Sequence, residues 1–214
     1  MEIDQLPESG AFLKSWYDSL SDPRGAQERV LDDLLDGYQR TSYGQRHSAS
    51  KVSGIEDFRR NFPASNYESF VHLLDAVAEG RHEELLPEPA KGWVMTRGTT
   101  GLPKFFPITN THLRQIIVCG SRAVLNYASR EGKARLYKRP VLNLCFPSDI
   151  GRIKVGDREL SSYGYSSGTY AKLATGFGNF RLVPSQGDID GLGADGGGVW
   201  ARRFDLIYNE AKGL

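Results

Sequence analysis

Over the first ninety residues, apolar side chains recur at one-turn spacing, which is the pattern of amphipathic helices. In the stretch that follows Asp22, the apolar stripe comprises Val30, Leu31, Leu34, Leu35 and Tyr38. Asp22 is a suitable N-cap, and Pro23 fits the first helical position because Pro lacks the N–H that a first turn leaves unpaired. We therefore predict a helix from Pro23 that packs through this stripe.

Two further helices are predicted before residue 90. Ser53 stands three residues before Glu56, which is the spacing of a capping box and predicts a short helix that ends before Pro63. Another helix is expected from about Asn66, with Gly80 as its stop. Its apolar face comprises Phe70, Leu73, Leu74 and Val77. We interpret these helices as packing elements.

From residue 91 onward, short apolar runs alternate with Gly-containing and polar segments. Residues 91–96 and 104–109 have the composition of short strands, and Thr109 is a good N-cap for a long helix. The inward positions expected of that helix are Leu113, Ile116, Ile117, Val124 and Tyr127. Residues 139–146 form a nearly continuous apolar run, which is expected of a strand buried on both faces.

The last third of the chain continues this mixture of strands and helices. Residues 152–160 place Gly156-Asp157 between two β-compatible arms, which predicts a hairpin with a type II′ turn. Residues 179–184 are expected to form a further short strand, and residues 201–214 an amphipathic helix. Helices and strands that intermix along a chain predict an α/β fold.

One segment, residues 185–198, is rich in Gly and contains three Asp. A calcium loop of the EF-hand type is excluded, because Val199 stands where the closing Glu is needed when counting from Asp188. We interpret the segment as a flexible surface connection.

The composition is that of an ordinary globular protein. The chain has 214 residues, 39% hydrophobic and 25% charged, with a net charge of +1. This balance argues against a main role in gripping nucleic acid or an anionic membrane. The two cysteines, Cys119 and Cys145, make no CxxC pair, which favours a reducing compartment. The polar start and the short apolar runs favour a cytoplasmic protein with no signal peptide and no membrane helix.

Between the first two predicted strands lies a segment rich in phosphate-binding groups. It contains Gly98, Thr99, Thr100, Gly101 and Lys104. Glycines let backbone N–H groups approach an anion, hydroxyls add donors, and a Lys supplies charge. The Walker A pattern does not fit, because Pro103 and Phe105 stand where Gly and Ser or Thr are needed. From the local pattern alone, a phosphate loop and a plain Gly-Pro turn are about equally supported.

The wider sequence resembles a known family. Residues 96–109, TRGTTGLPKFFPIT, resemble the phosphate-loop signature of the adenylate-forming superfamily. The continuation after Lys104 is similar to that of the auxin-responsive acyl acid–amido synthetases, in particular their microbial branch. Residues 28–47 and 55–86 resemble earlier segments of the same family, and the ordered set spans about residues 25–184.

The resemblance implies a ligase that activates a carboxylic acid with ATP and Mg²⁺. Such enzymes form an acyl-adenylate, release pyrophosphate and pass the acyl group to an amine, often an amino acid. It also implies the N-terminal portion of the large domain of an adenylate-forming enzyme, with residues 1–90 as a helical lead-in and residues 91–214 as an α/β part. Two alternatives stay open, a thiol acceptor as in acyl-CoA ligases and a truncated, catalytically inactive nucleotide-binding fragment.

Carried over position by position, the resemblance assigns nucleotide binding to one set of residues and metal ligation to none. The set is Thr96, Arg97, Gly98, Thr99, Thr100, Gly101 and Lys104. Lys104 is also assigned a catalytic role. Arg97 departs from the family, which usually has Ser there, and its guanidinium could add phosphate donors or crowd the loop.

The family's later signatures have no counterpart before Leu214. These are the segment that follows the adenine site and ends in Glu, the ribose-binding Asp and the mobile C-terminal domain. We therefore expect the chain to be the front part of a longer enzyme. A second Gly/Ser cluster, residues 162–170, is interpreted as a buried turn or as part of an acyl pocket.

Overall fold

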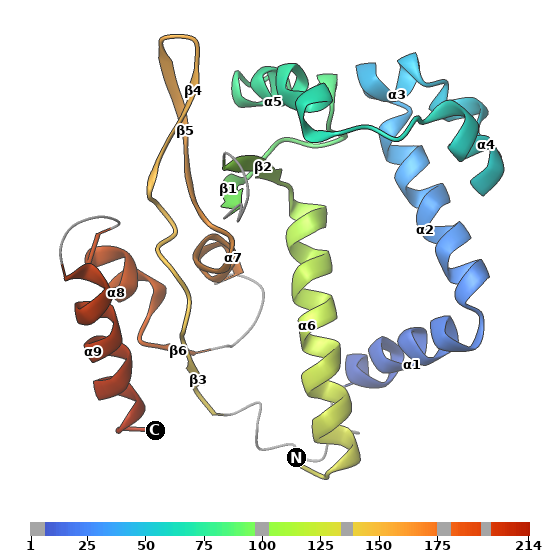
Figure 1. Ribbon diagram of the computed structural model, residues 1–214. Coiled ribbons are helices and arrows are strands. Elements are labelled where there is room, and N and C mark those ends of the chain that lie inside the picture. Colours follow the sequence, from blue (N-terminus) through green and yellow to red (C-terminus); the bar gives the residue numbers. More distant parts are fainter. Residues whose placement is uncertain (1–6, 97–102, 134–138, 175–180, 194–197) are drawn as a thin grey trace. The chain divides into compact units, whose positions relative to one another are not determined.

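The computed structural model describes residues 7–96, 103–133, 139–174, 181–193 and 198–214 (Figure 1). The chain divides into two compact units, one made of Met1–Ala90 with Val118–Ala134 and the other of Lys91–Ile117 with Arg135–Leu214. Helix α6 (Asn110–Arg130) is shared, because its residues through Ile117 belong to the second unit and the rest to the first.

All strands and helices that the structure describes in the first unit are helices, which confirms the predicted helical lead-in. Its α-helices, besides the end of α6, are α1 (Pro7–Ser21), α2 (Pro23–Tyr38), α3 (Ser42–Arg46), α4 (Ile55–Asn61) and α5 (Val71–Ala78). Short 3-10 turns are η2 (Ala49–Lys51), η3 (Tyr67–Phe70) and η4 (His82–Glu84). Helix α1 is tied to α6 by hydrogen bonds from Tyr17 to Asn126 and from Arg122 to Ser15.

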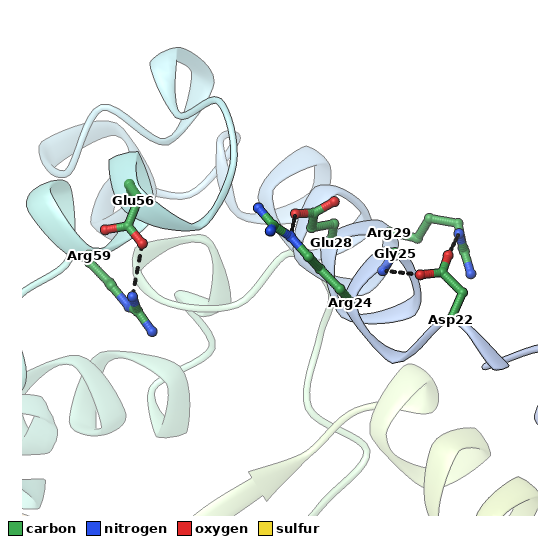
Figure 2. Close-up of polar contacts among 7 residues, drawn as sticks. All are labelled: Asp22, Arg24, Gly25, Glu28, Arg29, Glu56 and Arg59. Carbon is green, nitrogen blue, oxygen red and sulfur yellow. Dashed lines mark hydrogen bonds and ion pairs between the residues drawn. The ribbon is translucent and has the colours of Figure 1, made fainter. Parts of the chain in front are cut away.

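Helix α2 begins where the sequence predicts (Figure 2). The side chain of Asp22 accepts a hydrogen bond from the N–H of Gly25 at 3.0 Å, and Pro23 occupies the first turn. Arg24 donates to Glu28 one turn later at 3.0 Å. Both side chains of that ion pair are exposed, so solvent screens their attraction and the pair adds little stability. The cap, rather than the ion pair, fixes the start of the helix.

The capping box predicted for α4 is wrong. The N-cap is Gly54, with φ of +85°, a conformation that residues with a Cβ rarely adopt. The N–H of Ser53 donates instead to Asp57 at 3.1 Å. The acidic side chain that reaches back is therefore one residue further on than expected, and Glu56 pairs with Arg59 at 2.9 Å (Figure 2).

Helix α5 carries the core of the first unit, as predicted. Asn66 caps the η3 turn by accepting from the N–H of Ser69 at 3.1 Å, and α5 follows directly. Its buried residues are Leu73, Leu74, Ala76 and Val77. Gly80, with φ of +95°, then ends the helix.

The apolar stripes of α2 and α6 are only partly buried, which corrects the expectation that they pack inward along their whole length. On α2, Leu35 is 8% exposed but Val30 is 54% and Leu34 is 44% exposed. On α6, Leu113 is buried whereas Val124 and Tyr127 are about half exposed. Periodicity predicts which side of a helix is apolar, and it does not say what covers that side.

The second unit contains a four-stranded mixed sheet in the order β2-β1-β5-β4 and a two-stranded parallel sheet of β3 and β6. The strands are β1 (Gly92–Thr96), β2 (Lys104–Ile108), β3 (Val141–Leu142), β4 (Gly151–Val155), β5 (Arg158–Tyr165) and β6 (Leu182–Val183). Its further helices are α7 (Ser166–Ala174), α8 (Gln186–Gly191) and α9 (Val199–Ala211). This mixture confirms the predicted α/β class.

The predicted hairpin over residues 152–160 is confirmed. Strands β4 and β5 are antiparallel, and Gly156 has φ of +59° whereas Asp157 does not have positive φ, as a type II′ turn requires. Strand β5 extends well past β1 on the side of this turn, because only Trp93 to Met95 pair with it (Figure 1).

Two predictions for the second unit are wrong. The strand expected over residues 139–146 is confined to Val141 and Leu142, and Leu144 is 61% exposed. Residues 185–198 are not all a loose connection, because Ser185 and Asp188 form a capping box that starts α8. Residues 194–197 lie outside the described part of the chain.

The core of the second unit lies between the first sheet and two helices. Val94 of β1, Ile108 of β2 and Leu113 of α6 are buried together. Ile117, Tyr170 and Leu173 pack against them. Thr109 begins α6 as predicted, since its side chain accepts from the N–H of His112 at 3.2 Å. Among the helices described, none is both long and apolar enough to cross a membrane.

Gly168 offers a test of the packing between α7 and the segment before β4. A Cβ built on Gly168 would lie 1.9 Å from the carbonyl oxygen of Phe146. We expect Gly168→Ala to lower the free energy of unfolding by about 2 kcal/mol or more, because backbone must move to admit the methyl group. Urea denaturation measures the change.

Gly120→Ala is the matched control for this test. Gly120 lies in α6, and a Cβ there would meet no described atom within 4 Å. Because Ala favours a helix over Gly by about 1 kcal/mol, this variant should be neutral or more stable. Equal stability changes for the two variants would contradict the packing described.

Candidate functional site

The two strands of the β1–β2 hairpin close the predicted phosphate loop at its base. Thr96 and Lys104 are the last register pair of the hairpin, and Thr96 Oγ1 donates to the carbonyl oxygen of Lys104 at 3.4 Å. Both side chains are exposed. The other five residues assigned to the loop, Arg97, Gly98, Thr99, Thr100 and Gly101, lie outside the described residues. Of the assigned residues, the structure therefore describes only Thr96 and Lys104, which lie on either side of the loop.

The parallel pairing of β1 and β5 defines the edge at which this loop lies. Val94 is in register with Gly164 and Met95 with Tyr165, so the carboxyl ends of both strands meet at one edge of the sheet. Helix α7 begins at Ser166, directly after β5. In open α/β sheets, ligands bind outside the carboxyl ends of the parallel strands. This edge, with the loop after β1 and the start of α7, is the candidate site.

The Gly/Ser cluster at residues 162–170 is not the turn that the sequence suggested. Its first part, through Tyr165, is the end of β5, and the rest forms the first half of α7. The expectation of a turn was reasonable for a segment rich in Gly and Ser. What the segment does is bring a strand end and a helix start to the edge that carries the loop.

Helix α6 begins at the other end of the hairpin. Gly92 pairs with Ile108, four residues along β1 from Thr96, which is about 13 Å at the rise of a strand. His112, in the first turn of α6, therefore does not lie beside the loop, although it was the nearest His in the sequence. Its Nε2 lies 3.1 Å from the hydroxyl of Tyr170, and burial raises the pKa of that hydroxyl.

The segment from Asn143 to Ser148 forms the flank of β5 on the side away from β1. The N–H of Tyr165 donates to the carbonyl oxygen of Pro147 at 3.1 Å. Gly164 allows this approach, because a Cβ on it would lie 2.1 Å from the carbonyl oxygen of Ser148. The end of β5 is thus held between β1 and an irregular segment.

Asp190 of α8 holds this segment through hydrogen bonds from Ser148. Its carboxylate accepts hydrogen bonds from the N–H of Ser148 at 2.8 Å, from the hydroxyl of Ser148, and from Nε2 of Gln186 at 2.9 Å. Gln186 is buried and also donates to the carbonyl oxygen of Phe146 at 3.0 Å. Buried polar groups need such partners, so these side chains replace the ladder that a strand would have supplied.

Arg203 of α9 also binds this segment. Its Nε donates to the carbonyl oxygen of Cys145 at 3.0 Å, and its guanidinium lies 4.3 Å from the ring centroid of Phe146. Burial raises the pKa of the Cys145 thiol, which disfavours the reactive thiolate form. The sequence offered no pattern for Arg203, because its partners are backbone atoms far away in the chain.

A family model matches most of the chain. Residues 12–176 match the GH3 family N-terminal domain. The matched range contains the β1–β2 hairpin, β5 and α7, and therefore the strand ends that form the candidate site. Helices α8 and α9 lie beyond it.

Two curated relatives from Arabidopsis thaliana are similar to about half of the chain. The 4-substituted benzoates-glutamate ligase GH3.12 is 27% identical over 104 residues, which is 48% of this chain and 18% of the relative. The indole-3-acetic acid-amido synthetase GH3.15 is 28% identical over 109 residues, which is 50% of this chain and 18% of the relative. The matched part is less than a fifth of either relative.

Solved structures share the fold. The AtGH3.15 acyl acid amido synthetase in complex with 2,4-DB has a TM-score of 0.66 at 20% identity, covering 83% of this chain and 30% of that chain. A structure of the GH3.15 acyl acid amido synthetase gives a TM-score of 0.63 with the same coverage. These structures confirm the predicted fold class, and the family model confirms the predicted family. The microbial branch stays a prediction.

Asp190→Ala tests whether the half-buried carboxylate holds the segment beside β5. The variant removes the acceptor of the Ser148 N–H and of Gln186 Nε2, two buried residues, so we expect a loss of about 2–4 kcal/mol in unfolding free energy. Asp188→Ala is the matched control, because Asp188 serves an exposed capping box and its loss should cost about 1 kcal/mol. Equal losses in urea denaturation would contradict the fastening.

Proposed function

This chain belongs to the GH3 family, and from that premise we propose that it is part of an ATP-dependent acyl acid–amido synthetase. In the proposed reaction a carboxylate attacks the α-phosphate of ATP, forming an acyl-adenylate and releasing pyrophosphate. The acyl group then passes to an amine with release of AMP, and an amino acid is the expected acceptor. The single observation that supports it most is the closed base of the loop, Thr96 with Lys104, at the carboxyl edge of two parallel strands.

The proposed nucleotide site uses the groups at this edge. Arg97 to Gly101 belong to the proposed Gly-rich loop, and loops of this kind donate backbone N–H groups to phosphate oxygens, here those of the β- and γ-phosphates. Lys104, at the end of the loop, balances their charge and stabilises the pyrophosphate as it leaves, which is its catalytic role. Thr96 holds the base of the loop through its contact with the carbonyl oxygen of Lys104.

The donor set at this edge fits a magnesium–nucleotide complex. An ammonium group and hydroxyls recognise phosphate oxygens, and Mg²⁺ usually keeps several waters and binds through the substrate phosphates rather than a cage of protein ligands. When bound, the ion shares the negative charge of the leaving pyrophosphate. The proposed partners are the acid and the amine, and the proposed location is the cytoplasm.

A second candidate function rests on the extent of the match. The structural match spans 83% of this chain and 30% of the AtGH3.15 chain, and the loop is the only family nucleotide signature found in the sequence. By itself, this part would then bind nucleotide without completing the reaction. A thiol acceptor is the other alternative, in which CoA rather than an amino acid discharges the adenylate.

Lys104→Ala should weaken binding of Mg-ATP at least tenfold, because a hydrogen bond to a charged group contributes about 1.5–3 kcal/mol. Isothermal titration of the chain with Mg-ATP measures the dissociation constant. Lys91→Ala is the matched control, since Lys91 is exposed at the opposite end of the same hairpin, and its affinity should stay within twofold of the unmodified chain. Similar affinities of Lys104→Ala and Lys91→Ala for Mg-ATP would contradict the assignment of the loop to phosphate binding.

ATP–pyrophosphate exchange tests the adenylation step. With the native protein purified from its source cells and a panel of carboxylic acids, one acid should stimulate exchange, because adenylation is reversible while the acyl-adenylate stays bound. Adding amino acids or CoA then shows which acceptor discharges it. Native protein that binds Mg-ATP but gives no exchange with any acid would support the nucleotide-binding fragment and contradict the synthetase.

A further inference from the structure

The start of α7 lies against the irregular segment that precedes β4. The N–H of Phe146 donates to Oγ of Ser167, in the first turn of α7, at 3.1 Å. A Cβ on Gly168 would lie 1.9 Å from the carbonyl oxygen of Phe146. Just before the helix, the N–H of Tyr165 donates to the carbonyl oxygen of Pro147 at 3.1 Å. Because closely packed backbones move together, a displacement of the segment also displaces the start of α7.

The position of this segment depends in turn on α8. Asp190 accepts hydrogen bonds from both the N–H and the hydroxyl of Ser148, and Gln186 donates to Asp190 and to the carbonyl oxygen of Phe146. Ser148 and Gln186 are only 6% and 5% exposed, so a donor that loses its partner there is poorly supplied by water. Asp190 is the one charged side chain among these groups, and hydrogen bonds to a charged group are about twice as strong as neutral ones.

Asp190 stands behind the candidate site rather than in it. The first residue of α7, Ser166, is exposed at the carboxyl edge of β1 and β5. The carboxylate of Asp190 reaches that edge only through the backbone of residues 146–148, since its donors are Ser148 and Gln186. Hydrogen bonds weaken steeply when a donor is misaligned. A group that fixes the edge from behind can therefore govern the affinity for a ligand that it does not touch.

We propose that Asp190 is a positioning residue of the candidate site, which fixes the start of α7 at the phosphate edge through Ser148 and Phe146. Without this carboxylate, the segment takes other arrangements and the start of α7 follows it. The apparent dissociation constant for a phosphate ligand then rises, because only a fraction of the protein keeps the arrangement that binds. This inference rests on the proposed function, which places phosphate at this edge. Helix α8 lies beyond residues 12–176, so the match to the family model does not itself assign this role.

Calorimetric titration of the native protein with Mg-pyrophosphate tests the proposal. The native protein is produced in its source cells with Asp190→Ala, and the dissociation constant should rise at least fivefold. Asp188→Ala is the matched control, because Asp188 is a carboxylate of the same helix that bonds to Ser185 in the capping box. Its dissociation constant should stay within twofold of the unmodified protein. All proteins are titrated at a temperature at which circular dichroism shows them to be folded.

The comparison separates positioning from a purely structural role. A carboxylate that only stabilised the fold would lower the unfolding midpoint and leave the affinity of the folded protein unchanged. Ser148→Ala is a milder variant that keeps the proposal testable if Asp190→Ala does not fold. It removes the hydroxyl that donates to Asp190 and retains the N–H that does so. Its dissociation constant should rise about threefold, and an unchanged value would overturn the proposal.

Hydrogen exchange of the ligand-free protein gives a second readout that does not depend on nucleotide. The amide of Tyr165 bonds to Pro147 beside the start of α7. Its exchange should be at least tenfold faster in Asp190→Ala than in the unmodified protein, because local opening exposes this amide more often. In Asp188→Ala its exchange should be unchanged.

Together the two readouts distinguish this inference from the proposed function. If the native protein binds no Mg-pyrophosphate but exchange at Tyr165 still rises in Asp190→Ala alone, the nucleotide assignment fails and the positioning of α7 by Asp190 stands. If the native protein and Asp190→Ala bind Mg-pyrophosphate equally well, the nucleotide assignment stands and the positioning role is overturned. Equal losses of affinity in Asp190→Ala and Asp188→Ala would overturn it as well.

Discussion

The parallel pairing of β1 with β5 is the constraint on which the candidate site depends. It brings the end of β1, where the loop begins, beside the end of β5, where α7 begins. Neither strand end is held by β1–β5 pairing alone. Gly164 and Gly168 let the backbone of Phe146 to Ser148 approach closely. Asp190 accepts a hydrogen bond from the N–H of Ser148, and Arg203 donates to the carbonyl oxygen of Cys145, just before this stretch. A short region of irregular chain thereby supports the regular sheet edge at which β1 and β5 end.

Much of this fold could be predicted from local sequence, because the signals act over a few residues. The Asp22 cap, the Gly156 turn and the Thr109 cap each depend on a side chain or a positive φ within one turn of the chain. The irregular segment after β3 could not be predicted, because its apolar letters look like a buried strand while its hydrogen-bond partners lie about 40 residues later in α8. Helix α8 was not predicted either, because the capping box of Ser185 and Asp188 that starts it was not identified in the sequence.

In the candidate site, too, local features could be predicted from the sequence and long-range contacts could not. The loop residues were identified by resemblance, and the hairpin that closes the loop at Thr96 and Lys104 follows from two short strands. Which other elements share its edge depends on strand order and direction, which sequence patterns do not encode. The start of α6 is the helix start closest to the loop in the sequence, whereas the sheet brings the start of α7 to this edge. Likewise, the apolar sides of α2, α6 and α9 could be predicted from the sequence, but the elements that cover these sides could not.

The central claim is that nucleotide phosphate binds at the carboxyl edge of β1 and β5. Amide chemical shifts of the isotope-labelled chain, recorded during titration with Mg-pyrophosphate, test it most directly. The account predicts that the largest shifts occur at Thr96, Lys104 and Ser166, with little change at Gly92 and Ile108 at the opposite end of the hairpin. The largest shifts at Gly92 and Ile108, or in the helical unit alone, would contradict it.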